Sequence, residues 1–363
     1  MQKLPRWADL ALIPVLNLLL AFLISGLVIL AIGENPISAL KVMIDGTFFR
    51  AAGWGYMLYY ATNFIFTGLG VSVAFHASQF NIGGEGQATL GGLGVALVCL
   101  FIPWPHWSLA LIAAVVASAV FGAAWAAIPA WLQVKRGSHI VITTIMFNFI
   151  SFALLNYLLS YVLKPLGKMD PATDNFPAAT ALPKLHDLPG LDAIFDKNTP
   201  VNISLFIALG CAFLVWVLIW RTRLGYMLRA FGKSEKAAVY AGISPLKITM
   251  IAMLISGGLS GMMAINNVMG EAQRLLLNSV EGAGFIGIAV ALMGRSHPVG
   301  VVLASLLFGF LYQGGAELAL WTTIPRDLIT VIQGLVILFT GALDNLVRDP
   351  VERLFLTFSK EQK

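Results

Sequence analysis

Polar residues interrupt the apolar sequence at two related stretches. The first, Phe80 to Gln87, reads FNIGGEGQ, and the second, Asn267 to Gln273, reads NVMGEAQ. Asn, Gly, Glu and Gln recur at positions one, four, five and seven of NIGGEGQ and NVMGEAQ. The carboxylates of Glu85 and Glu271 are costly inside a bilayer, so each one either faces a cavity or a partner, or caps its own broken helix.

The side chains around these stretches suit two roles, contact with a solute or support of a bend. Amides can hydrogen-bond sugar hydroxyls or tie a broken backbone together, and glycines let the chain turn and approach its neighbours closely. On a helix, Thr144 and Asn148 share one face because they are four residues apart. The pathway candidates are Phe80, Asn81, Gln87, Thr144, Asn148, Asn267 and Gln273, and the candidates for bending the helices are Gly83, Gly84, Glu85, Gly86, Gly270 and Glu271.

The sequence offers little for catalysis or for a bound cofactor. Gly232-Lys233-Ser234 resembles the end of a phosphate-binding loop, but the glycine required five residues earlier is Met227. The five histidines have no metal-ligand spacing, and neither a Gly-x-Ser-x-Gly nor a His-Glu-x-x-His motif occurs. We therefore expect neither an enzyme nor a cofactor bound by this chain.

The composition indicates a membrane protein with many spans. Of the 363 residues, 58% are hydrophobic and 11% charged, with a mean hydropathy of +0.83, whereas soluble domains carry about 25% charged residues. The net charge of +5 comes from Lys and Arg in short segments between apolar runs, as in the positive-inside rule. No basic stripe interleaved with aromatic residues indicates nucleic acid as a partner.

The apolar runs predict an all-α polytopic fold with about ten transmembrane helices. Lipid-exposed backbone must be hydrogen-bonded internally, and alternating ten-residue segments typical of a barrel are absent from the sequence. We interpret the first run as a retained span rather than a cleaved signal peptide. The runs lie near 10–32, 54–79, 87–102, 108–134, 140–163, 201–220, 248–268, 284–293, 299–313 and 327–343.

The connecting segments predict an orientation for a single permease domain, 1–363. Basic residues gather in segment 221–247 and in the tail 344–363, which we expect in the cytoplasm with both chain ends. The near-neutral, proline-rich segment 164–200 is then an external loop. The two polar stretches are five spans apart and would face opposite ways, so we predict two inverted repeats, spans 2–5 and 7–10, as in transport proteins.

The basic segment 221–247 contains a short helix that we predict from Glu235 to Ala241. Ser234 is suited to its N-cap and Gly242 to the position after its C-cap. It is either an ordinary basic loop or a helix with a small-residue surface that docks on a cytoplasmic partner. The docking candidates are Arg229, Gly232, Ser234, Glu235, Ala237, Ala238, Tyr240, Ala241 and Gly242.

Four stretches in this order resemble the membrane subunits of ABC importers for nucleosides and simple sugars. They are FNIGGEGQ, VITTIMFNFI (141–150), RAFGKSEKAAVYAGI (229–243) and GFIGIAVALMGRSHPVGVVLASLLFG (284–309). The length and the long loop resemble the larger permease of a two-permease system within the ribose-permease-like superfamily. One departure is Ile140, where many members carry an acidic residue.

The resemblance implies an importer of nucleosides or simple sugars in the inner membrane. Its other parts would be a second permease, a cytoplasmic ATPase that holds ATP-Mg, and an external binding protein of the basic membrane lipoprotein kind. A rival hypothesis is an ion- or proton-coupled secondary transporter that uses Glu85 and Glu271.

Overall fold

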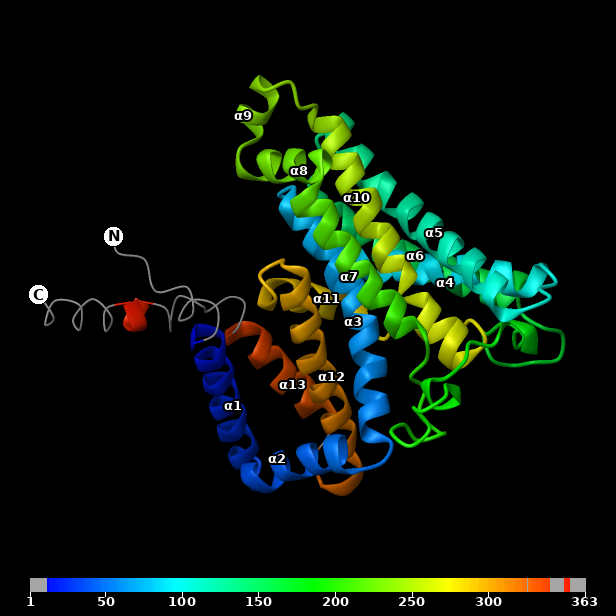
Figure 1. The fold of residues 1–363 in the computed structure, drawn as a ribbon, viewed down its shortest axis with the longest axis vertical. Helices are drawn as coiled ribbons and strands as arrows, with labels where there is room; N and C mark the ends of the chain where they lie inside the picture. The colour runs from blue at the N-terminus through cyan, green and yellow to red at the C-terminus, as the bar shows by residue number, and fades with distance from the viewer. Residues whose placement is uncertain (1–11, 325, 340–348, 353–363) are drawn as a thin grey trace, which may run out of the picture. The chain divides into compact units, whose positions relative to one another are not determined.

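The computed structural model describes residues 12–324, 326–339 and 349–352, and this part of the chain is helical apart from turns, loops and two isolated β-bridges (Figure 1). It forms two compact units. The larger unit comprises 51–309, and the smaller combines 1–50 with 310–363. The functional candidates of the sequence all lie in the larger unit.

The larger unit is a bundle of long apolar helices around three central ones. In α3, in α4 and in the span that contains α10, 78%, 72% and 78% of the most apolar window is buried, against 22% in α5. Its helices are α3 Gly53–His76, α4 Gly84–Phe101, α5 Trp107–Arg136, α6 Ile140–Tyr157, α7 Ser204–Arg221, α8 Arg223–Lys233, α9 Glu235–Tyr240, α10 Pro245–Met262, α11 Ala283–Met293 and the first half of α12 Pro298–Trp321. Leu158–Val162 after α6 and Ile265–Ala272 after α10 are π-helical.

The polytopic all-α prediction is confirmed. Eight helices of the described chain are long and apolar enough to cross a membrane. Of the two remaining predicted runs, the one near 284–293 forms the shorter α11, and the one near 327–343 forms α13 Arg326–Ile337 as far as it is described. α4 begins at Gly84, three residues before its predicted start.

Close helix packing holds the larger unit together. α4 packs against α10, and α11 packs against α3. Close approach depends on glycine: Gly122 of α5 lies against the backbone of Gly257 and Gly261 of α10. Small residues at such crossings are typical of membrane helices, which associate by close packing.

The long loop and the α8–α9 segment lie at opposite ends of the larger unit (Figure 1). Loop 164–200 contains 3-10 turns at Ala178–Thr180 and Leu185–Asp187. It is bonded to the segment that follows α10, because Thr173 N donates to Leu275 O at 3.1 Å and Phe176 N to Gln273 O at 2.7 Å. Which end faces the cytoplasm stays a prediction.

The smaller unit contains α1 Ile13–Ala31, α2 Pro36–Ile44, a π-helical turn at Asp45–Phe49, the second half of α12, and α13. The Asn35 side chain caps α2 by accepting from Ile37 N at 2.9 Å. Phe48 stacks on Phe310 of α12, with ring centroids 5.5 Å apart. Most of the predicted tail 344–363 lies outside the described residues, apart from 349–352.

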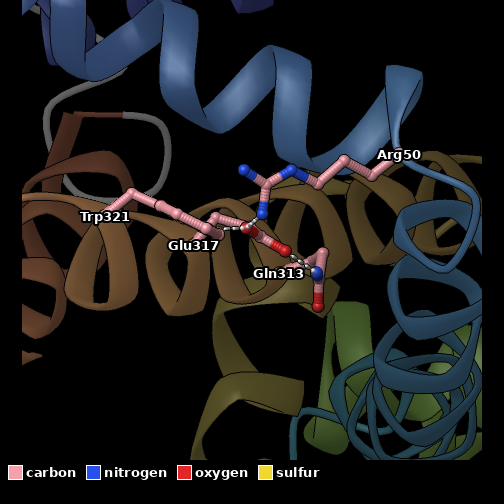
Figure 2. Close-up of polar contacts among 4 residues, drawn as sticks. All are labelled: Arg50, Gln313, Glu317 and Trp321. Carbon is pink, nitrogen blue, oxygen red and sulfur yellow. Dashed lines mark hydrogen bonds and ion pairs between the residues drawn. The ribbon is translucent and has the colours of Figure 1, made fainter.

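In the smaller unit, the buried carboxylate of Glu317 accepts hydrogen bonds from three side chains. Figure 2 shows Glu317 of α12 accepting from Arg50 at 2.5 Å, from Trp321 Nε1 at 3.0 Å and from Gln313 Nε2 at 3.1 Å. The Arg50 guanidinium also lies 4.4 Å from the Trp321 ring centroid, a cation–π distance. This network joins the end of the π-helical turn to α12.

Candidate functional site

The first polar stretch breaks the chain between α3 and α4. α3 ends at His76, Ser78 has φ 55°, and 79–83 is extended or turned before α4 starts at Gly84. A new helix begins with backbone N–H groups that have no partner within the helix. Two side chains accept from donors near this start, Asn81 of the break from Gly83 N and Asn148 of α6 from Gly86 N.

Asn81 and Gln87 form a reciprocal amide pair across the break. Asn81 Nδ2 donates to Gln87 Oε1 at 2.9 Å, and Gln87 Nε2 donates back to Asn81 Oδ1 at 3.1 Å. Asn81 also accepts from Gly83 N at 2.9 Å and donates to Ser256 Oγ of α10 at 2.8 Å. Both amides are buried, so in this conformation they bond to the protein itself.

Asn148 of α6 bonds both the end of the break and the first turn of α4. Its Oδ1 accepts from Gly86 N at 2.9 Å, and its Nδ2 donates to Ile82 O at 2.9 Å. On the same buried face, the Thr144 hydroxyl bonds its own helix at Ile140 O, 2.8 Å away. Asn148 therefore supplies from α6 a hydrogen bond that a continuous α3–α4 helix would have made for itself.

Glu85, in the first turn of α4, reaches the beginning of α11. Its Oε1 accepts from Gly282 N at 2.9 Å, and its Oε2 accepts from Gly284 N at 2.9 Å. Gly284 also packs against the backbone of Gly84 and Glu85, where a Cβ at Gly284 would overlap. The two helices thus meet backbone to backbone at their N-termini.

We name this meeting point, residues 81–87 with 282–284, the half-helix junction. The N-terminus of each helix carries a partial positive charge, and the half-buried Glu85 carboxylate lies at both. Transporters built from inverted repeats place such broken-helix ends at their central site. Phe80 and Phe285, each one residue outside the junction, are exposed by 38% and 48%.

The second polar stretch adopts a different structure from the first. Asn267 to Ala272 lies inside the π-helical extension of α10, and only Gln273, with φ 50°, leaves the helix. Glu271 is exposed at the end of a helix, whereas Glu85 is in a first turn. Although Glu271 matches Glu85 in sequence, the two residues differ in local structure, because the first stretch begins a helix and the second ends one.

A separate buried cluster lies around Asn266, the residue directly before the second stretch and outside the repeated motif. Asn266 Oδ1 accepts from Asn202 Nδ2 at 2.9 Å and from Ser204 Oγ at 2.8 Å, and its Nδ2 donates to Asn63 Oδ1 at 2.9 Å. Gly270 packs against the Asn202 side chain. Asn267 instead donates to Ser279 O at 2.5 Å. The sequence feature that could have predicted this cluster is the presence of asparagines, such as Asn63 and Asn266, inside apolar runs.

The α8–α9 segment has the predicted capping. Ser234 Oγ accepts from Ala237 N at 3.3 Å, Gly242 has φ 81°, and Ile243 N donates to Ala238 O at 2.9 Å, the pattern of a Schellman motif. That this segment docks on a partner stays a prediction; among the docking candidates, Ala238 is 3% exposed and therefore lies on the inner side of α9. Tyr240, 95% exposed, is the large side chain that α9 presents outward.

α8 touches α3 directly before the break. Gly232, near the end of α8, lies against His76 O and Ser78 N, and a Cβ there would overlap the carbonyl oxygen. α8 is amphipathic and buries Leu228 and Phe231 on the bundle. The α8–α9 segment is therefore in contact with the residues that lead into the half-helix junction.

The chemically active side chains of the larger unit are mostly amides and hydroxyls. Within the described ranges, no group of three or more His, Cys, Asp or Glu side chains could hold a metal. The two cysteines are buried in different helices, Cys99 in α4 and Cys211 in α7. What the larger unit offers is amide, hydroxyl and aromatic chemistry beside two helix N-termini.

Residues 53–341 match the family described as branched-chain amino acid transport system, permease component. This match covers all but the first two residues of the larger unit and most of the chain. The chain belongs to this permease family. The α3–α4 break, the junction and the α8–α9 segment all lie within the matched residues, so they are features of the permease itself.

Relatives of this permease carry names for sugars and nucleosides. The glucose ABC transporter permease TsgB13 of Haloferax volcanii is 33% identical over 93% of this chain and 88% of its own. The guanosine ABC transporter permease NupP of Bacillus subtilis is 32% identical over 91% and 93%. The nucleoside ABC transporter permease NupB of Lactococcus lactis is 30% identical over 90% and 90%.

The similar permeases also come in pairs. A second guanosine permease of the same Bacillus, NupQ, matches at 29% identity over 74% of this chain, and a second putative glucose permease of the same Haloferax, TsgC13, at 26% over 69%. In both pairs the member with the higher identity is also the one that covers more of this chain. A permease of this kind therefore occurs beside a second one in the same organism.

Proposed function

We propose that this chain is one of two permease subunits of an ABC importer that carries nucleosides or simple sugars across the inner membrane. The half-helix junction supports this proposal most directly, because two broken helices meet end to end at Glu85 within the family fold. The substrates for which the relatives are named, glucose and guanosine among them, support the substrate class.

The charge at the junction favours an uncharged solute. In other transporters the N-termini of broken helices attract anionic groups of the substrate. Here the Glu85 carboxylate occupies both N-termini, so no free positive helix end remains at this point for a substrate anion. Asn81, Gln87 and Asn148 would exchange their bonds with one another and with backbone for bonds to solute hydroxyls when the junction opens.

The driving force would come from a separate cytoplasmic ATPase that binds ATP-Mg and docks on α9. Tyr240 and its exposed neighbours Ala237 and Ala241 form the contact surface, and Ser234 and Gly242 hold the helix in shape. Movement of α9 passes to α8 and through Gly232 to the end of α3. From there 77–83 leads into the junction. An external binding protein of the basic membrane lipoprotein kind would deliver the solute at the 164–200 loop.

Uptake by cells that express the complete system tests this function. We expect uptake of radiolabelled guanosine or glucose that is lost when this chain is deleted, and lost again when the ATPase subunit carries an inactive nucleotide site. Collapse of the proton gradient with ATP maintained should leave uptake intact. Uptake that followed the gradient and ignored ATP would overturn the proposal in favour of a secondary transporter.

A further inference from the structure

An apolar groove separates α7 from the first turn of α12 in the larger unit. Its volume is about 450 Å³, and its walls include Phe213 and Trp216 of α7 and Val299 and Val302 of α12. That volume is within the range of small-molecule sites, roughly 300–1,000 Å³. Every lining side chain is apolar, so the groove is suited to a hydrocarbon chain and not to the solutes proposed for the junction.

One end of the groove carries positive charge. The rings of Phe213 and Trp216 stack with centroids 6.0 Å apart, and the Arg221 guanidinium lies 5.3 Å from the Trp216 centroid. Among the described residues, the ion pairs do not include Arg221, which is exposed at the end of α7. Pro298, the first residue of α12, also lines the groove, so the positive N-terminus of that helix lies there.

We propose that this groove binds one anionic phospholipid, with an acyl chain between α7 and α12 and the phosphate beside Arg221 and the start of α12. An anionic phospholipid suits the groove better than an apolar protein segment does, because its phosphate would neutralise Arg221. An apolar segment would leave Arg221 without a counter-charge. Basic pockets between membrane helices are typical sites for lipid headgroups, and Trp is typical of the interface level. The bound lipid would fasten α7, and through it α8, to α12.

Photoreactive lipids test the site in the intact transporter. The complete complex is placed in nanodiscs that contain equal amounts of phosphatidylglycerol and phosphatidylcholine, each with a diazirine on its acyl chain, and adducts are mapped by mass spectrometry. We expect adducts within 209–216 and 298–302, about fivefold more of them from phosphatidylglycerol, the preference that one Arg near a membrane surface confers.

Three variants test the contacts of the lipid headgroup and of the acyl chain separately. Arg221→Gln should remove the preference for phosphatidylglycerol, whereas Arg223→Gln, exposed two residues later on α8, should keep it. Ala212→Trp should fill the groove and remove adducts from both lipids, with thermal unfolding measured to verify that it is folded. Equal labelling by both lipids in the unsubstituted chain would overturn the proposal, as would an absence of adducts in the complex, which would mean that protein covers the groove.

Discussion

At the scale of single residues, Glu85 stands out because its carboxylate, in the first turn of α4, bonds the beginning of α11. Hydrogen bonds to a charged group contribute about 1.5–3 kcal/mol each, and Glu85 makes two to the backbone of α11. Glu271, which occupies the same position in the second copy of the motif, is exposed at a helix end. The two carboxylates should therefore behave differently when each is neutralised.

Glu85→Gln should destabilise the permease and Glu271→Gln should not. The amide keeps one acceptor for the two N–H donors of Gly282 and Gly284 and turns a donor toward the other, so we expect a loss of about 2 kcal/mol or more. Thermal unfolding in detergent measures this loss, and uptake should fall with it. Equal effects of the two variants would contradict the junction as described and would favour paired coupling carboxylates.

Asn148→Ala tests whether this residue supports the break. It leaves Gly86 N and Ile82 O without partners, and a buried group without a partner costs about 1–3 kcal/mol. Asn156→Ala, on an exposed face of the same helix, is the control. We expect lower thermal stability and lower uptake only for Asn148→Ala. Normal uptake and selectivity in that variant would remove Asn148 from the pathway.

At the scale of helices, α8 and α9 are the elements that connect the predicted ATPase surface to the break. Tyr240→Ala removes the most exposed large side chain of α9, whereas Tyr226→Ala removes an exposed tyrosine of α8. We expect Tyr240→Ala to lower retention of the ATPase on purified membranes with no change in thermal stability. Equal retention in both variants would argue that α9 is only an ordinary basic connection.

Gly232→Ala tests the contact between α8 and α3. The added Cβ would overlap His76 O, so α8 must move away from the end of α3. We expect the ATPase to stay bound while stimulation of its activity by substrate and binding protein drops. Gly210→Ala, where no atom outside its own stretch of α7 lies within 4 Å of the new Cβ, is the matched control. Full stimulation in the Gly232 variant would place the transmission elsewhere.

At the scale of the whole molecule, the exposed apolar helices indicate further protein or lipid around this chain. In α5 and in the α6 span, 22% and 28% of the most apolar window is buried. The pairing of similar permeases in Bacillus and Haloferax indicates a second permease. A tagged version of this chain expressed with its neighbouring subunits should therefore purify with one different permease, measured by intact mass. A complex with two copies of this chain would contradict a heterodimer.

The sequence by itself determined the class of the protein, because a chain with 58% hydrophobic and 11% charged residues can be stable only in a bilayer. It also determined the caps of α9, since capping depends on residues within a few positions of one another. It predicted a break at 80–87 from local glycine and amide content.

Only the tertiary structure decided what that break contacts. Gly282 and Gly284 are about two hundred residues from Glu85, and no local pattern specifies a pairing that arises when α4 and α11 cross. The same reason explains why Glu271 does not share the local structure of Glu85, and why the sequence did not predict the buried hydrogen-bond cluster around Asn266. Similar letters in NIGGEGQ and NVMGEAQ did not determine structure, because one stretch begins a helix and the other ends one.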